Sequence, residues 1–235
     1  MATATVAGAL LILSAIWFNL WFFVLARRFD YPDILRRPAE DVLARFQSGG
    51  SSLILIWWLF MASGGFLVAS AVLLSRVLGQ HELTGAVIAG VVGVLAGLVQ
   101  VLGLLRWVYL VPELARVHAD PEASEATRAA AAITFRAFHR YLGVGVGEHL
   151  GYLLTGTWTA LVGIAILRSE AVTVWLGWIA LPIGAGLTVA SAEFLGPNEA
   201  RGWALAGKAV PLLYGAWSLW LAALGMALIA GPAPP

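Results

Sequence analysis

The chain has 235 residues, of which 60% are hydrophobic and 11% charged, with 14 Lys and Arg against 13 Asp and Glu. Soluble domains average about 45–50% apolar and about 25% charged residues, so this composition excludes a water-soluble enzyme, a disordered chain and a nucleic-acid-binding module. The chain has no cysteine, which also excludes disulfides, thiolate metal sites and thiol catalysis. We therefore expect an all-α, polytopic membrane protein.

Six stretches are long and apolar enough to cross a membrane as helices, since one crossing takes about 20 apolar residues. They are residues 5–26, 52–75, 83–111, 141–167, 172–194 and 208–230. The first has no basic start and no cleavage-like site, so it does not have the pattern of a signal peptide. We expect one transmembrane domain over residues 1–235, a bundle of six spans.

Two further helices are expected between these spans. Residues 38–47 begin with a proline followed by acids, and Val42, Leu43 and Phe46 share one face. This pattern predicts a short interfacial helix that lies against the inner leaflet. Residues 120–137 are helical by composition and are expected to continue into the fourth span. Most tryptophans, Trp57 and Trp107 among them, lie near span ends and suit the aromatic belts of a membrane protein.

Lys and Arg are concentrated in alternate loops. The loops after the first, third and fifth spans contain eleven of them, and the other two loops contain only Arg76 and Arg168. The eleven are Arg27, Arg28, Arg36, Arg37, Arg45, Arg116, Arg128, Arg136, Arg140, Arg201 and Lys208. Because cytoplasmic loops are enriched in Lys and Arg, we expect both termini to be extracytoplasmic. The expected location is the bacterial cytoplasmic (inner) membrane, with membrane lipids as partners.

Glycines recur every four residues on two spans, at Gly93 and Gly97 and at Gly143, Gly147 and Gly151. Such small-residue faces let helix backbones approach closely. Packing within the bundle is the favoured interpretation, and a homo-oligomer formed through the same faces is the alternative.

Two charged residues stand out inside the spans. Arg106 lies near the cytoplasmic end of the third span, and Glu148 lies near the start of the fourth. At 1.5 Å per residue each is about 10 Å inside the inner boundary. Charges inside a membrane are costly unless paired, so opposite charges at matched depth on consecutive helices predict a buried ion pair.

Other polar residues fall in the same layer and predict a polar cavity in the cytoplasmic half of the bundle. Glu148, Tyr152, Thr155 and Thr159 form one stripe that Tyr141 extends, and Arg106, Tyr109 and Glu113 share a face of the third span. As a catalytic set we expect Glu148 and His149 as acid and base, with Arg106 as an electrostatic clamp. The expected ligand-binding residues are Tyr152, Tyr109, Asn19, Tyr214 and His139. The alternatives are a purely structural Arg106–Glu148 pair, and a His139 that only marks the interface with the headgroups.

No cofactor and no metal are expected. His139 and His149 lie on one span and His81 lies on the opposite side of the membrane, so paired axial haem ligands are disfavoured. Glu148 and His149 lack an evident third metal ligand. Lys208, the sole lysine, begins the last span, where it is poorly placed to form a Schiff base.

The segment 138–152, FHRYLGVGVGEHLGY, with LLRW at 104–107 before it, resembles an uncharacterised family of small bacterial six-helix membrane proteins, a domain of unknown function. The resemblance covers most of the chain from the third span onward. It implies the six-helix architecture and carries over no functional residue.

Three functions are consistent with these features. The first is binding, or acid–base chemistry, on a lipophilic small molecule in the polar cavity. A structural or assembly subunit of a membrane complex is the second, for which glycine faces and short loops suffice. The third is a small proton-coupled transporter with Glu148 as its proton site, although no inverted repeat is visible.

Overall fold

The computed structural model describes residues 2–80, 83–169, 172–195, 198 and 202–231. Within this part of the chain every regular element is helical, and six helices are long and apolar enough to cross a membrane. The predicted all-α architecture is thereby confirmed. The α-helices are α1 (Ala2–Phe29), α2 (Ala39–Leu78), α3 (Leu83–Tyr109), α4 (Val111–Ala119), α5 (Glu125–Phe138), α6 (Gly151–Leu167), α7 (Trp175–Ala190) and α8 (Ala204–Ala230). Shorter segments are η1 (Asp33–Arg36), the π-helical η2 (His139–Leu150) and η3 (Ser191–Phe194).

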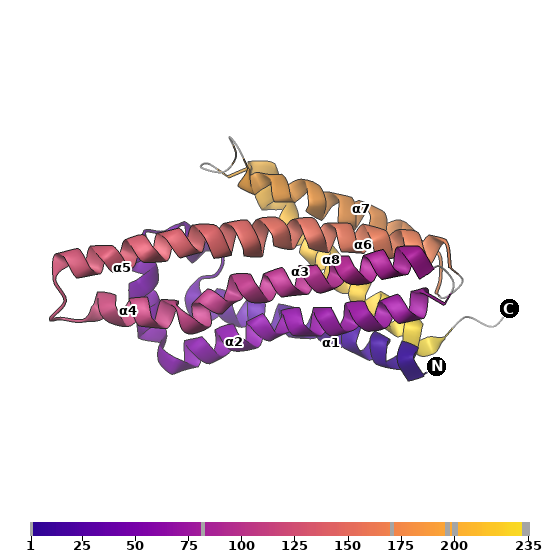
Figure 1. Ribbon diagram of the computed structural model, residues 1–235, viewed down its shortest axis with the longest axis horizontal. Helices are drawn as coiled ribbons and strands as arrows, with labels where there is room; N and C mark the ends of the chain where they lie inside the picture. The colour runs from indigo at the N-terminus through magenta and orange to yellow at the C-terminus, as the bar shows by residue number, and fades with distance from the viewer. Residues whose placement is uncertain (1, 81–82, 170–171, 196–197, 199–201, 232–235) are drawn as a thin grey trace.

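The spanning helices lie side by side along the long axis of the molecule (Figure 1). α1 packs between α2 and α8, α2 against α3, α3 against α6, and α6 against α7. The start of α1 and the end of α8 lie at one end of the bundle, opposite the turn between α4 and α5 (Figure 1). The two ends of the molecule, called here the termini end and the hairpin end, therefore have different structures.

Two helical rods extend past the length that a membrane requires. α3 and α4 together span Leu83–Ala119, and α5, η2 and α6 together span Glu125–Leu167. At 1.5 Å per residue these rods are about 55 and 65 Å long, against a hydrocarbon thickness of about 30 Å. The expected helix before the fourth span is thus confirmed as α5, and its Ser124 Oγ accepts the N-cap hydrogen bond from Thr127 N at 3.1 Å.

The hairpin end has a hydrophobic core of its own. Val42, Leu43 and Phe46 share a face as predicted, but each is at most 2% exposed. They pack with Trp107 and Phe135 in a cluster drawn from α1, η1, α2, α3, α4 and α5. Protein side chains therefore cover this face, and the interfacial position of residues 38–47 stays a prediction. The segment is the first part of the 40-residue α2, which is broken by the non-helical Gly50.

Aromatic rings fill this second core. Trp57 and Trp107 stack with ring centroids 4.5 Å apart and planes 6° apart, and Phe29 packs edge-on against both. Both tryptophans are fully buried, so the aromatic-belt interpretation fails for this pair. The stack joins α2 to the last turn of α3, which is the turn that contains Arg106.

Candidate functional site

Arg106 is a buried cation, 5% exposed, in the last turn of α3. Its Nη1 donates a hydrogen bond to the carbonyl of Gly103, and its Nη2 lies 3.4 Å from His139 Nδ1. The guanidinium carbon lies 5.1 Å from the centroid of the Trp107 ring, a cation–π distance. Nε has no hydrogen-bond partner. Arg106 therefore keeps one buried donor free.

Glycines provide the space for this guanidinium. A Cβ on Gly143 would lie 2.6 Å from Arg106 Nη2, and a Cβ on Gly103 would lie 2.5 Å from the Cα of Gly147. On the other helix face, a Cβ on Gly97 would lie 2.6 Å from the carbonyl oxygen of Gly64. The repeated glycines are thus used for contacts within the bundle, and a homo-oligomer through them stays a prediction.

The expected Arg106–Glu148 ion pair does not form. No residue in the described part of the chain makes an ion pair or hydrogen bond with the Glu148 side chain, which is half-buried. Arg106, Arg36 and Arg140 act on this carboxylate only through their electric field. The physical reason is local. η2 is π-helical, so it has more residues per turn than the α-helix that was assumed from the sequence. The Arg106 guanidinium contacts His139 instead of Glu148.

Tyr152 and Tyr214 lie close enough to the Glu148 carboxylate to interact with it electrostatically. The ring of Tyr152 packs at 5.4 Å against both Tyr214 of α8 and Phe194 of η3. Nearby, Thr155 Oγ1 accepts a hydrogen bond from Gln100 Nε2 at 3.2 Å. Two predicted members lie elsewhere: Tyr109 is 71% exposed and Tyr141 is 70% exposed. Both positions flank helix irregularities, at Leu110 and within η2, where α-helical spacing does not apply.

The other predicted site residues make contacts that join neighbouring elements. His149 Nδ1 donates to the carbonyl of Ser191 at 3.0 Å, which ties η2 to η3. His139 stacks on Phe135 with planes 6° apart. Asn19 Nδ2 donates to Ser218 Oγ at 2.8 Å, so it joins α1 to α8. His81 lies outside the described residues.

Tyr31 belongs to this cluster, although sequence reasoning missed it. It lies in the turn between α1 and η1, and its ring packs at 5.3 Å against Trp57 and 6.0 Å against Phe60. Burial raises the pKa of Tyr31 above its ordinary value of 10.0, and the negative charge of Glu148 raises this pKa further. The hydroxyl is therefore a protonated donor at neutral pH. Its position in a loop has no periodicity that could have revealed it.

Comparison of the amino-acid sequence with known protein families shows the family of the chain. The family described as Domain of unknown function (DUF4386) matches residues 6–225. The chain belongs to this family. That range includes the central part of each of the helices α1 to α8. No curated protein matches the chain. No solved structure matches it either.

Family membership confirms the resemblance noted from residues 104–107 and 138–152, and these residues build the Arg106 site described above. The family description assigns no chemistry to them. In the described residues no group of three or more His, Asp and Glu side chains is placed to hold a metal ion. Arg106, Glu148, Tyr31, Tyr152 and Tyr214 are called the polar cluster below.

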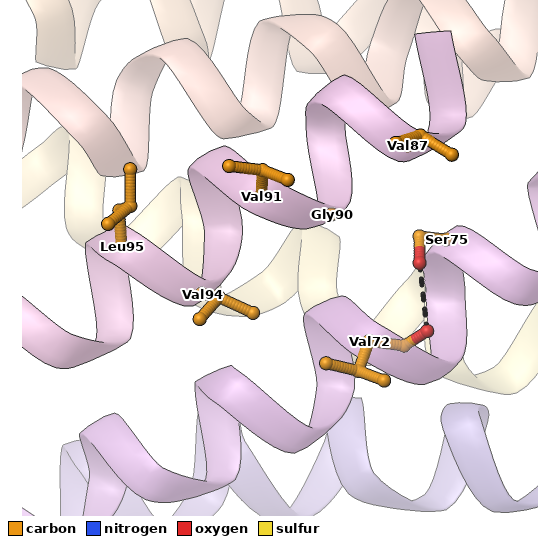
Figure 2. A pocket seen from close by; sticks show the side chains of 7 residues that line it. All are labelled: Val72, Ser75, Val87, Gly90, Val91, Val94 and Leu95. Carbon is orange, nitrogen blue, oxygen red and sulfur yellow. Dashed lines mark hydrogen bonds between the residues drawn. The ribbon is translucent and has the colours of Figure 1, made fainter. Parts of the chain in front are cut away.

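Two surface recesses lie away from the polar cluster. One, of about 340 Å³, lies between α2 and α3 and is lined almost entirely by aliphatic side chains. Figure 2 shows Val72 and Ser75 on one wall facing Val91 and Val94 on the other, with the Ser75 hydroxyl bonded back to its own helix. The second, of about 360 Å³, is lined by arginines and serines at the hairpin end.

Proposed function

We propose that the protein binds a lipophilic small molecule at the polar cluster, with Glu148 and His149 able to exchange a proton with it and Arg106 holding an oxygen atom. The observation that carries this proposal is the Glu148 carboxylate. It is half-buried in a spanning rod and has no hydrogen bond or ion pair from any described residue. An ionisable group in that position is costly unless something satisfies it.

The neighbouring groups suggest what the missing partner provides. Glu148 is an acceptor without a donor, and Arg106 Nε is a donor without an acceptor. A ligand with a hydroxyl or N–H beside a carbonyl or anionic oxygen would satisfy both. The rings of Phe18 and Phe194, which pack on Tyr214 and Tyr152, offer apolar surface for the rest of the molecule.

The test identifies the small molecules that co-purify with the protein. Wild-type protein, the Glu148→Gln variant and a Glu113→Gln control are purified from membranes, extracted with organic solvent and compared by mass spectrometry. Glu113 is an exposed carboxylate that pairs with Arg116 and is not a member of the polar cluster, so its loss removes equal charge outside the cluster. We expect a lipophilic compound that is enriched with wild type and control and at least about tenfold depleted in Glu148→Gln, which corresponds to about 1.4 kcal/mol.

Each variant's thermal unfolding is followed by tryptophan fluorescence, so that misfolding is recognised. A folded Glu148→Gln protein that retains the same compounds as wild type would contradict the proposal. If no compound is enriched with any of the three proteins, the assembly-subunit interpretation gains support instead.

We further propose that the hairpin end faces the cytoplasm of a bacterial cell and that both termini lie outside the inner membrane. The support is the concentration of Lys and Arg in the first, third and fifth loops, which contain eleven of these residues against two in the others; the turn between α4 and α5 belongs to the third loop.

A further inference from the structure

The second recess lies where α1 ends and α2 is broken. Its lining comes from two short stretches, the last turn of α1 and the residues on either side of Gly50 in α2. The lining residues are Arg27, Arg28, Arg45, Ser48, Gly49, Ser52, Leu53 and Ile56. The recess has a volume of about 360 Å³, enough for the polar headgroup of a lipid but not for a whole lipid molecule.

The charge of the recess is entirely positive. Its lining includes three arginines and no carboxylate. In the described part of the chain none of these arginines forms an ion pair, whereas Arg37 pairs with Asp30 and Arg116 with Glu113. Arg45 Nη2 donates to the carbonyl of Arg28 at 3.2 Å, which holds Arg45 beside the end of α1. Three uncompensated guanidinium groups around one hollow favour an anion with several oxygens.

The backbone adds to this preference. Gly50 has φ +56°, a left-handed conformation that breaks the helix between the arm of α2 and its spanning part. The spanning part therefore begins beside Ser52, with the positive end of its helix dipole next to the arginines. The Ser48 and Ser52 hydroxyls donate to the carbonyls of Arg45 and Gly49, so the arginine N–H groups are the donors left for an anion.

An apolar surface leads from the recess toward the termini end. Within the lining, Leu53 and Ile56 lie on that side, further along α2 than the serines. On α1, Ile16, Leu20 and Phe23 step by four and three residues toward Arg27. They are 60, 49 and 62% exposed. A cationic hollow joined to an exposed aliphatic stripe matches a molecule with a charged head and a hydrocarbon tail.

We propose that this recess binds the phosphate of an anionic membrane lipid, with the arginines on the phosphate oxygens and an acyl chain along Ile16, Leu20 and Phe23. The site is separate from the polar cluster and does not depend on the function proposed for it. A zwitterionic lipid fits less well, because its ammonium group would approach the same three guanidinium groups.

Native mass spectrometry of the detergent-solubilised protein tests this site. Wild type is titrated with phosphatidylglycerol, phosphatidylcholine and glycerol phosphate, beside the Arg27→Gln/Arg28→Gln/Arg45→Gln variant. The control is Arg37→Gln/Arg116→Gln/Arg136→Gln, which removes the same charge from the same end of the molecule. We expect wild type and control to bind phosphatidylglycerol at least about tenfold more tightly than phosphatidylcholine, and the recess variant to lose this preference.

Three outcomes would overturn the proposal: equal binding of the two lipids by wild type, equal loss in the control, or glycerol phosphate binding as tightly as phosphatidylglycerol. The last outcome would mean that the hollow takes a soluble phosphate and that the apolar stripe plays no part. Arg45 bonds to the α1 backbone, so the triple variant is accompanied by Arg27→Gln/Arg28→Gln, which leaves that bond in place. If only the double variant folds, its loss of preference decides the question.

Discussion

Arg106 occupies a position that only small neighbours permit. Gly103 lies one turn before it on α3, and Gly143 and Gly147 lie opposite it on η2. The guanidinium contacts a carbonyl, an imidazole and the Trp107 ring, and it makes no direct contact with a carboxylate. Glu148 acts on this cation only at a distance, which leaves the carboxylate oxygens available for another partner.

Replacing Gly103 by alanine tests this close packing. The added Cβ would lie 2.5 Å from the Cα of Gly147, so α3 and η2 must separate. We expect a loss of about 1–3 kcal/mol in the free energy of unfolding, as for overpacked cores. The measurement is thermal unfolding followed by tryptophan fluorescence. Gly65→Ala is the control, because nothing lies within 4 Å of its added Cβ. A Gly103→Ala protein as stable as this control would show that the contact is not tight.

At the scale of elements, the arm of α2 before Gly50 shows how far a hydrophobic pattern can be interpreted. Val42, Leu43 and Phe46 were predicted to share a face, and they do. The pattern shows that one face of the helix is apolar. Either lipid or protein can remove such a face from water. The partner is protein here because α3 and α5 bring Trp107 and Phe135 to the arm.

Phe46→Ala distinguishes these two environments. The side chain is 2% exposed and packs on Phe29 and Trp107, with ring centroids at 5.9 and 5.8 Å. We expect its loss to reduce the free energy of unfolding in detergent by about 3–5 kcal/mol. Gln47→Ala, at the exposed neighbouring position, should change it by less than about 0.5 kcal/mol. A small effect of Phe46→Ala would show that this face is not held by protein contacts and would favour lipid as its environment.

At the scale of the whole molecule, the two ends of the bundle differ in charge and in shape. The termini end has short loops, whereas the hairpin end contains the paired helices α4 and α5 and a second hydrophobic core (Figure 1). Both proposed sites lie toward the hairpin end, since Arg106 ends α3 and Arg27 ends α1. Orientation in the membrane therefore decides which compartment reaches them.

The absence of cysteine allows a direct test of orientation. Glu122→Cys places a thiol at the turn between α4 and α5, and Thr173→Cys places one before α7; both residues are exposed. We expect a membrane-impermeant maleimide to label Thr173→Cys in whole cells and Glu122→Cys only after the inner membrane is opened. The reverse labelling pattern would invert the proposed topology, and the unmodified chain provides the background.

The amino-acid sequence by itself determined that this is an all-α membrane protein and where its spans are. Backbone groups in hydrocarbon must form their hydrogen bonds within each helix, and this requirement appears in the sequence as the length and hydropathy of the spans. The sequence also singled out Arg106 and Glu148 as charges inside the membrane. Only the tertiary structure decided that these two do not pair, that Tyr31 joins them from a loop, and that three arginines from α1 and α2 meet around one hollow. The reason is that helix periodicity relates residues on one regular helix, whereas these arrangements depend on a π-helical segment, a left-handed glycine and the packing of separate helices.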